Sequence, residues 1–411
     1  MGGGEGYKAV AYYTDWSIYA RGYEPAKMPA DKLTHVLYSF ADNRDTGEIV
    51  FTDTWSDTDK HWPGDSWNDV GKNLYGGLKQ MNLIKKKNRN MKLLLSIGGW
   101  TYAHEQKHFD VPASTPQGRK AFAQSCVNMI KNFGFDGIDI DWEYPQNPDQ
   151  GDQLFLLLQE IRTAMNTYAN TLAGYCGSKP HFWLSIAAPA GEANYKNMPL
   201  GKIAQVTDFI NLMGYDYSGS WDNAAGHQAN LFASQSCPTC TPFNTDKVIQ
   251  DYINNGVPPH KLVLGMPLYG RAFTNTKGIG QSYNGIGAPD QSAGSWEAGV
   301  YDYKALPRPG AVEYYDKEAG ASYSYDNGSQ TLISYDNVDM AKRKAAYIKQ
   351  HNLGGGMWWE LSGDKTGEES IVQNVVREFG GYHGGKIEQS PNWLTYPDSQ
   401  YDNVKAGFPS E

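Results

Sequence analysis

The sequence predicts an α/β fold: a (β/α)8 TIM barrel with a small α+β domain inserted between its seventh and eighth strands. Eight short apolar runs recur along the 411 residues, and helical patterns such as 118–133 and 153–168 lie between them. The runs lack the alternation of polar and apolar residues typical of half-exposed antiparallel strands, which indicates buried parallel strands. Eight strand–helix units favour a closed barrel, and a doubly wound sheet is the alternative architecture.

Several of the expected strands end in polar or aromatic residues. Barrel enzymes carry their chemistry at the C-terminal ends of the strands, so we expect one site at that end. In chain order, the strands are expected at Ala9–Tyr13, His35–Phe40, Lys92–Ile97, Gly137–Asp141, Phe182–Ala187, Phe209–Met213, Leu262–Met266 and Gly356–Trp359.

One connection is unusually long. Residues 272–340 are rich in Gly, Ser, Tyr and Asp and contain no pattern for a long helix. A loop of that length without structure of its own would be unusual. We therefore expect an α+β insertion domain at 272–340 and a barrel formed by 7–271 and 341–411, with the tail after Gly381 wrapped around it. The strand-like pieces of the insertion are 312–315, 321–325 and 331–335.

Four carboxylates lie close together in an apolar, strand-like run, at Asp136, Asp139, Asp141 and Glu143. Burying so much negative charge is costly unless the charges are paired or used. Side chains two positions apart on a strand share a face, so the last three project the same way, roughly 6–7 Å apart per step. Asp136 has the opposite parity, and we expect it to support the strand. Acid–base chemistry requires such a row of acids.

Composition and charge exclude several classes of partner. The net charge of −9 does not favour nucleic acid, and no apolar run is long enough to span a bilayer. Three acids in a row also suit Mg²⁺ or Mn²⁺, but no phosphate-binding loop or histidine cluster accompanies them. We expect neither a metal nor an organic cofactor.

The four cysteines have different surroundings. Cys126 lies on an apolar helical stripe, which indicates a small buried side chain. Cys237 and Cys240 form a C-x-x-C motif, which supplies too few ligands for a structural zinc site. This pair could form a local disulfide or remain as two free thiols, and the sequence does not decide between them. Cys176 has no evident role.

The start of the chain, Met1–Gly6, lacks the apolar segment of a secretory signal and is similar to an added leader that replaces one. Asn327-Gly328-Ser329 is a glycosylation sequon, a feature of secreted proteins. We therefore expect an extracellular protein.

Two motifs resemble those of a known family. The acidic run Asp136-x-x-Asp139-x-Asp141-x-Glu143 and the stretch Ser96-x-Gly98-Gly99 are similar to the hallmark motifs of glycoside hydrolase family 18, the chitinases. The resemblance covers nearly the whole chain. The insertion is typical of members with a deep, walled cleft, and the aromatic-rich tail at 390–407 resembles secreted fungal chitinases. Further matching elements lie at 213–217, at 265–271 and at Trp359.

This resemblance implies a substrate-assisted, retaining hydrolysis of β-1,4-linked N-acetylglucosamine, through an oxazolinium ion formed by the sugar's own 2-acetamido group. It makes Glu143 the general acid and base, and Asp141 the group that orients the acetamide. Asp139 would share a proton with Asp141, and Tyr215 would donate its hydroxyl to the acetamido oxygen. Like charges this close raise pKa values, which keeps Glu143 protonated at mildly acidic pH.

The resemblance also implies an aromatic cleft. It places Trp359 beneath the distorted sugar and stacks Trp100 and Trp221 on the leaving-group side. The partners it implies are chitin and chito-oligosaccharides, bound by a monomer. The full set of expected substrate-binding residues is Tyr12, Phe40, Trp100, Met213, Asp216, Trp221, Tyr269, Arg271, Glu297 and Trp359.

Other readings of these residues remain open. Each tryptophan could belong to the core, Tyr215 and Asp216 could pair with each other, and Gly98-Gly99 could only shape a tight strand end. A chitinase-like lectin would share the fold without hydrolysis, but such lectins usually lack the acid that stands here at Glu143. An endo-β-N-acetylglucosaminidase acting on glycoproteins would share the mechanism. Endo or exo action and direction along the polymer also stay open.

Overall fold

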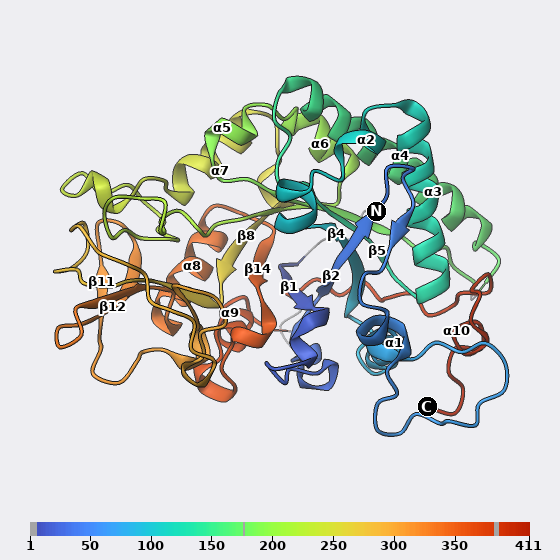
Figure 1. Ribbon diagram of the computed structural model, residues 1–411. Coiled ribbons are helices and arrows are strands. Elements are labelled where there is room, and N and C mark those ends of the chain that lie inside the picture. The colour runs from blue at the N-terminus through green and yellow to red at the C-terminus, as the bar shows by residue number, and fades with distance from the viewer. Residues whose placement is uncertain (1–5, 176, 382–385) are drawn as a thin grey trace.

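The computed structural model describes residues 6–175, 177–381 and 386–411, and its centre is a closed barrel of eight parallel strands (Figure 1). Each strand pairs in parallel with the next, and β1 pairs with both β2 and β14, which closes the barrel. The expected barrel is confirmed, and the doubly wound alternative is wrong because that sheet would have open edges. The barrel strands are β1 (Lys8–Thr14), β2 (His35–Asn43), β4 (Lys92–Gly98), β5 (Gly137–Asp141), β6 (Trp183–Ala188), β7 (Phe209–Leu212), β8 (Leu262–Pro267) and β14 (Gly355–Trp359). The short β3 (Ile49–Val50) adds to β2 in antiparallel.

Helices cover the outside of the barrel (Figure 1). Local sequence sets the ends of these helices. In α3 (Pro116–Phe133), the Thr115 side chain accepts a hydrogen bond from the backbone N–H of Gly118 at 3.0 Å at the start, and Gly134, with φ 79°, ends the helix. The helices are α1 (Gly76–Lys87), α2 (Asp110–Ala113), α3 (Pro116–Phe133), α4 (Pro148–Thr171), α5 (Glu192–Tyr195), α6 (Leu200–Val206), α7 (Thr245–Asn254), α8 (Val338–Gln350), α9 (Ile371–Glu378) and α10 (Asp402–Ala406). No helix among the described residues is long and apolar enough to cross a bilayer.

A separate five-stranded antiparallel sheet lies between β8 and β14 in the sequence and on one side of the barrel (Figure 1). Its first strand begins at Tyr269, directly after Leu268, so the sheet continues from the barrel strand almost without a loop. Its helical content consists of the short 3-10 turns Gln291–Ala293 and Tyr303–Ala305. The strands, in sheet order, are β10 (Val300–Asp302), β9 (Tyr269–Phe273), β13 (Thr331–Ser334), β12 (Ala321–Asp326) and β11 (Val312–Asp316).

The C-terminal tail packs against the N-terminal ends of the barrel strands, as expected. Lys92, the first residue of β4, donates to Glu388 at 2.5 Å, and both side chains are buried. Asp136, just before β5, forms an ion pair with Lys85 at 2.8 Å and accepts from the backbone N–H of Trp393 at 2.7 Å. Asp136 is therefore part of the structural base of the barrel, on the side away from the site.

The cysteine pair left open by the sequence is a disulfide between Cys237 and Cys240, with Cα atoms 5.4 Å apart. Cys126 is a free, buried thiol. Cys176 and residues 1–5 of the expected leader lie outside the described residues.

Candidate active site

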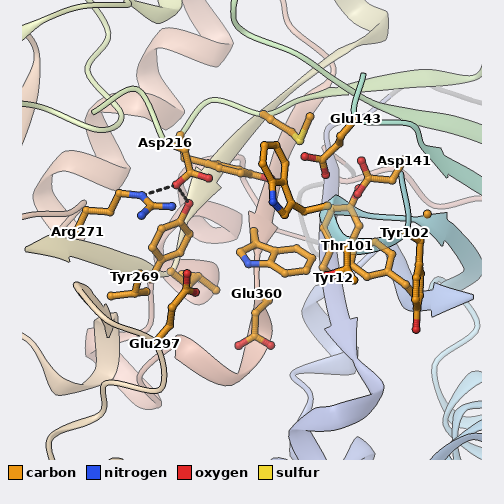
Figure 2. Close-up of a pocket in the computed structure, with 18 of the residues that line it drawn as sticks. Tyr12, Thr101, Tyr102, Asp141, Glu143, Asp216, Tyr269, Arg271, Glu297 and Glu360 are labelled. Atoms are coloured by element: carbon orange, nitrogen blue, oxygen red, sulfur yellow. Dashed lines mark hydrogen bonds and ion pairs between the residues drawn. The ribbon is translucent and has the colours of Figure 1, made fainter. Parts of the chain in front are cut away.

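A cleft of about 1200 Å³ opens at the C-terminal ends of the barrel strands (Figure 2). All the residues expected to bind substrate line it, and so do Asp141, Glu143 and Tyr215. Asp139 does not line the cleft but lies beneath it, at 0% exposure. The end of the barrel at which the strand sequences become polar and aromatic is therefore the end that carries the cleft.

Asp139 is held by three hydroxyl groups inside the barrel. Tyr12 and Ser96 donate to its Oδ2 at 3.0 and 2.8 Å, and Ser185 donates to its Oδ1 at 2.7 Å. Burial raises the pKa of Asp139, while these hydrogen bonds oppose the rise. The result is a buried carboxylate with donors on both oxygens.

Asp141 and Glu143 form the next layer outward, and their side chains lie next to each other (Figure 2). Burial raises the pKa of Asp141 well above its usual value, and the charges of Glu143 and Asp139 add to the rise. Burial also raises the pKa of Glu143 to about 7, with a further contribution from the negative charge of Asp216. The Asp141 Oδ1 atom has no hydrogen-bond partner among the described residues. Burial and charge thus favour a proton on this pair of carboxyl groups, and the Asp141 Oδ1 atom can accept a hydrogen bond from a ligand.

Asp216 is fixed from the insertion side of the cleft (Figure 2). Its Oδ1 accepts from the hydroxyl of Tyr269 at 2.5 Å and from Nε of Arg271 at 2.8 Å, both on β9. Tyr215 and Asp216 do not pair with each other, since the Tyr215 hydroxyl donates to the sulfur of Met357 at 3.9 Å. A thioether sulfur is a weak acceptor, so a stronger acceptor on a ligand in the cleft can replace it.

Aromatic rings form the floor. Trp359 stacks on Phe40 with centroids 5.6 Å apart and planes at 19°, and Tyr12 lies 5.1 Å from it. Phe40, Met213 and Trp359 pack on the apolar cluster that fills the barrel interior, which fixes their orientation. The floor is therefore rigid and apolar on the side that faces the cleft.

Two half-exposed tryptophans flank the cleft. Trp100 stacks on His104 with centroids 3.8 Å apart, and the guanidinium of Arg271 lies 4.9 Å from the ring of Trp221. Both indoles belong to the cleft surface and not to the core, so the core reading is wrong for them.

The Gly98-Gly99 pair shapes the cleft. Both residues have positive φ, 111° and 88°. A Cβ atom would lie 2.3 Å from the carbonyl oxygen of Asp141 at Gly98, and 2.7 Å from the ring of Phe40 at Gly99. Only glycine permits this strand end.

The sequence analysis missed several lining residues. Trp16 follows β1 by two positions, so the strand-end rule that located Trp100 would have found it. Tyr144 directly follows Glu143 and also lines the cleft. Arg21 pairs with Asp302 at 2.9 Å, and no sequence signal connects residues that far apart. Among the described residues, no group of three or more His, Cys, Asp and Glu is arranged to hold a metal ion.

A barrel whose cleft contains adjacent carboxyl groups above an aromatic floor is typical of glycoside hydrolases. Comparison with known proteins agrees: residues 8–364 match the family model of glycosyl hydrolases family 18. Endochitinase 1 of Metarhizium robertsii is 49% identical over 97% of this chain and 90% of its own length. Chitinase 1 of Aphanocladium album is 48% identical over 98% of this chain and 92% of its own length.

Solved structures show the same fold. The catalytic domain of the psychrophilic chitinase B from Arthrobacter superposes with a TM-score of 0.83 at 28% identity, over 95% of this chain and 99% of that domain. A chitinase from Bacillus thuringiensis superposes with a TM-score of 0.80 at 31% identity, over 92% of this chain and 70% of that chain. The chain belongs to glycoside hydrolase family 18. It is a glycoside hydrolase, and its expected resemblance to fungal chitinases is confirmed.

Proposed function

We propose that the protein is an extracellular chitinase that cleaves β-1,4-N-acetylglucosamine linkages in chitin and chito-oligosaccharides with retention of configuration. The observation that carries this proposal is the Asp141–Glu143 pair: two adjacent carboxyl groups line the cleft, and the Asp141 Oδ1 atom has no hydrogen-bond partner among the described residues. The raised pKa values of both groups favour a proton on the pair. The printed names of the fungal relatives support the substrate.

In the first step, the acetamido oxygen of the sugar above Trp359 attacks its own anomeric carbon. Glu143 gives its proton to the glycosidic oxygen, the C–O bond breaks, and an oxazolinium ion remains. Asp141 accepts a hydrogen bond from the acetamide N–H, and Tyr215 donates one to the acetamido oxygen. Each such oriented group stabilises the transition state by about 2–4 kcal/mol. In the second step, Glu143 takes a proton from a water molecule, and the water oxygen attacks the anomeric carbon. The oxazolinium ring opens, and the configuration at the anomeric carbon is retained overall.

Asp139 is the deeper acid that shares a proton with Asp141, and its negative charge contributes to the raised pKa of Asp141. Trp359 is the floor under the reacting sugar, and Trp100 and Trp221 stack on the leaving-group side. The other proposed substrate contacts are Tyr12, Phe40, Met213, Asp216, Tyr269, Arg271 and Glu297. We propose a monomer without metal or cofactor, bound to neither nucleic acid nor membrane, with the barrel at 7–271 and 341–411 and the insertion at 272–340.

The stereochemistry of the first product tests the mechanism. Proton NMR during hydrolysis of chitohexaose should show the β-anomer before mutarotation. Initial α-anomer would overturn substrate assistance. Binding of chitohexaose without any release of reducing ends would indicate a lectin, and cleavage confined to glycoprotein glycans would indicate an endo-β-N-acetylglucosaminidase.

A further inference from the structure

Arg21 lies where three separate parts of the chain meet at the cleft. It follows β1, and its Nη1 atom donates to both carboxyl oxygens of Asp302 on β10, at 2.9 and 3.0 Å. The same atom donates to the Ser362 hydroxyl at 3.3 Å and lies 3.9 Å from Oε1 of Glu360, and both of these residues come after β14. Arg21, Asp302 and Glu360 all line the cleft. One guanidinium therefore joins the barrel to the insertion sheet.

On the insertion side, Asp302 connects Arg21 to the segment that carries Glu297. The Asp302 Oδ2 atom accepts a hydrogen bond from the indole N–H of Trp296 at 3.0 Å. The Arg21 guanidinium lies 5.0 Å from the centroid of the Trp296 ring, which adds a cation–π contact. Glu297 directly follows Trp296, and it lines the cleft with its side chain exposed. The position of this wall segment therefore depends on contacts that end at Arg21.

On the barrel side, Glu360 connects the same arginine to the aromatic floor. Glu360 directly follows Trp359, and its Oε2 atom accepts a hydrogen bond from the hydroxyl of Thr14 at 3.0 Å. Thr14 is the last residue of β1, so the floor segment is fixed to the barrel at this point. Figure 2 shows Glu297 and Glu360 on the same side of the pocket. Arg21 thus contacts both the segment that carries the wall and the segment that carries the floor.

We propose that Arg21 is a positioning residue that sets the separation between the Glu297 wall and the Trp359 floor, and with it the affinity for a sugar bound between them. The inference rests on the proposed function, in which Glu297 and Trp359 contact the substrate. A wall that is already in place before the sugar binds loses little freedom on binding. Without the guanidinium, the same contact would have to be ordered at the expense of binding free energy.

The test is a double-mutant cycle on chitohexaose binding, measured by calorimetry in a Glu143→Gln background. Arg21→Met keeps the apolar stem but removes the guanidinium, and it should weaken binding about fivefold, as should Glu297→Gln. The double variant should bind at most about twofold more weakly than either single variant, because both changes remove the same contact. Arg21→Lys keeps a charge opposite Asp302 but not the planar fork, so its affinity should be intermediate.

The matched control is Arg162→Met, which breaks an ion pair of similar burial far from the cleft. Arg162 on α4 pairs with Asp208 at 2.6 Å, and its side chain is 16% exposed, compared with 18% for Arg21. Asp208 directly precedes β7, at the end of the barrel opposite the cleft. Thermal unfolding should show a loss of stability in both Arg→Met variants. Chitohexaose affinity should fall in Arg21→Met and stay within about twofold of the parent in Arg162→Met.

Parent-like affinity of Arg21→Met would overturn the proposal. So would losses that multiply to about 25-fold in the double variant, which would mean that Arg21 acts on the sugar independently of Glu297. Should Arg21→Met fail to fold, the same cycle with Arg21→Lys decides between these outcomes. Failure of the proposed function has a different signature: the protein with Glu143 intact releases no reducing ends from chitohexaose, while the binding cycle still shows coupling.

Discussion

The carboxyl groups of Asp141 and Glu143 lie side by side in the cleft, and the charge of Glu143 adds to the effect of burial in raising the pKa of Asp141. Burial favours the neutral form of both carboxyl groups. The proton needed by the leaving group is therefore already present in the free enzyme at mildly acidic pH, and the pair as a unit sets the range over which it is available.

Replacing Glu143 with Gln should abolish turnover while preserving binding. The amide has the size of the acid but cannot transfer a proton, so kcat should fall by about 10²–10⁴. Calorimetry should find chitohexaose affinity within about tenfold of the parent. Glu48→Gln is the matched control, since this exposed carboxylate forms an i,i+4 ion pair with Arg44 away from the cleft, and it should keep parent kinetics. Turnover of Glu143→Gln within tenfold of the parent would contradict the assignment.

The pH profile of kcat/KM should fall on its alkaline side near pH 7. Glu143 must be protonated to act as the acid, and its pKa is raised to about 7. The charge of Asp216 contributes to that rise, so Asp216→Asn should lower the pKa of Glu143 and move the alkaline limb to lower pH by a few tenths of a unit, because Asp216 is partly screened by solvent. The measurement is the pH at which kcat/KM falls to half of its plateau, which does not depend on the plateau value. A limb that moves to higher pH would be inconsistent with this account.

The same raised pKa predicts a pH-dependent stability difference. A carboxyl whose folded pKa lies above its unfolded value near 4.5 contributes full stability below that value, and the contribution is lost as pH rises to about 7. Neutral Gln avoids this loss. Glu143→Gln should therefore unfold like the parent near pH 4 and be more stable by about 2–3 kcal/mol at pH 8, measured in urea. Equal stability at both pH values would mean that Glu143 is not desolvated.

The base of the barrel offers a stability test far from the site. Glu388→Ala leaves the buried Lys92 ammonium without its carboxylate, which should cost about 3–5 kcal/mol of unfolding free energy. Glu48→Ala removes an exposed ion pair, and its effect should stay below about 1 kcal/mol. Urea unfolding of the two variants compares them directly. Similar small losses would show that the tail is not part of the cooperative core.

The sequence predicted the barrel because each strand is buried on both faces and therefore reads as a continuous apolar run. It predicted the acid row for a related reason: carboxylates such as Asp139 and Asp141 are conspicuous in an apolar strand. Side chains at or just after a strand end, such as Trp359 and Trp100, were accessible to the same reasoning.

Contacts between distant segments were not accessible. The three hydroxyl donors to Asp139 come from three other barrel strands, β1, β4 and β6, and nothing in the sequence indicates that Tyr12, Ser96 and Ser185 meet at one carboxyl group. The ion pair of Arg21 with Asp302 likewise depends on loop conformations that no periodicity encodes. Such pairings arise only when the barrel closes and brings the loops together.

The direct passage from β8 into β9 has a consequence for related barrels. Tyr269 and Arg271 are the partners of Asp216, and both belong to the first strand of the added sheet. A shortened relative without that sheet would lose its side wall and, in the same deletion, the two donors that hold the carboxylate opposite the acid pair. Shallow and deep clefts on this barrel should therefore differ in the pKa of the catalytic acid as well as in the length of substrate that they contact.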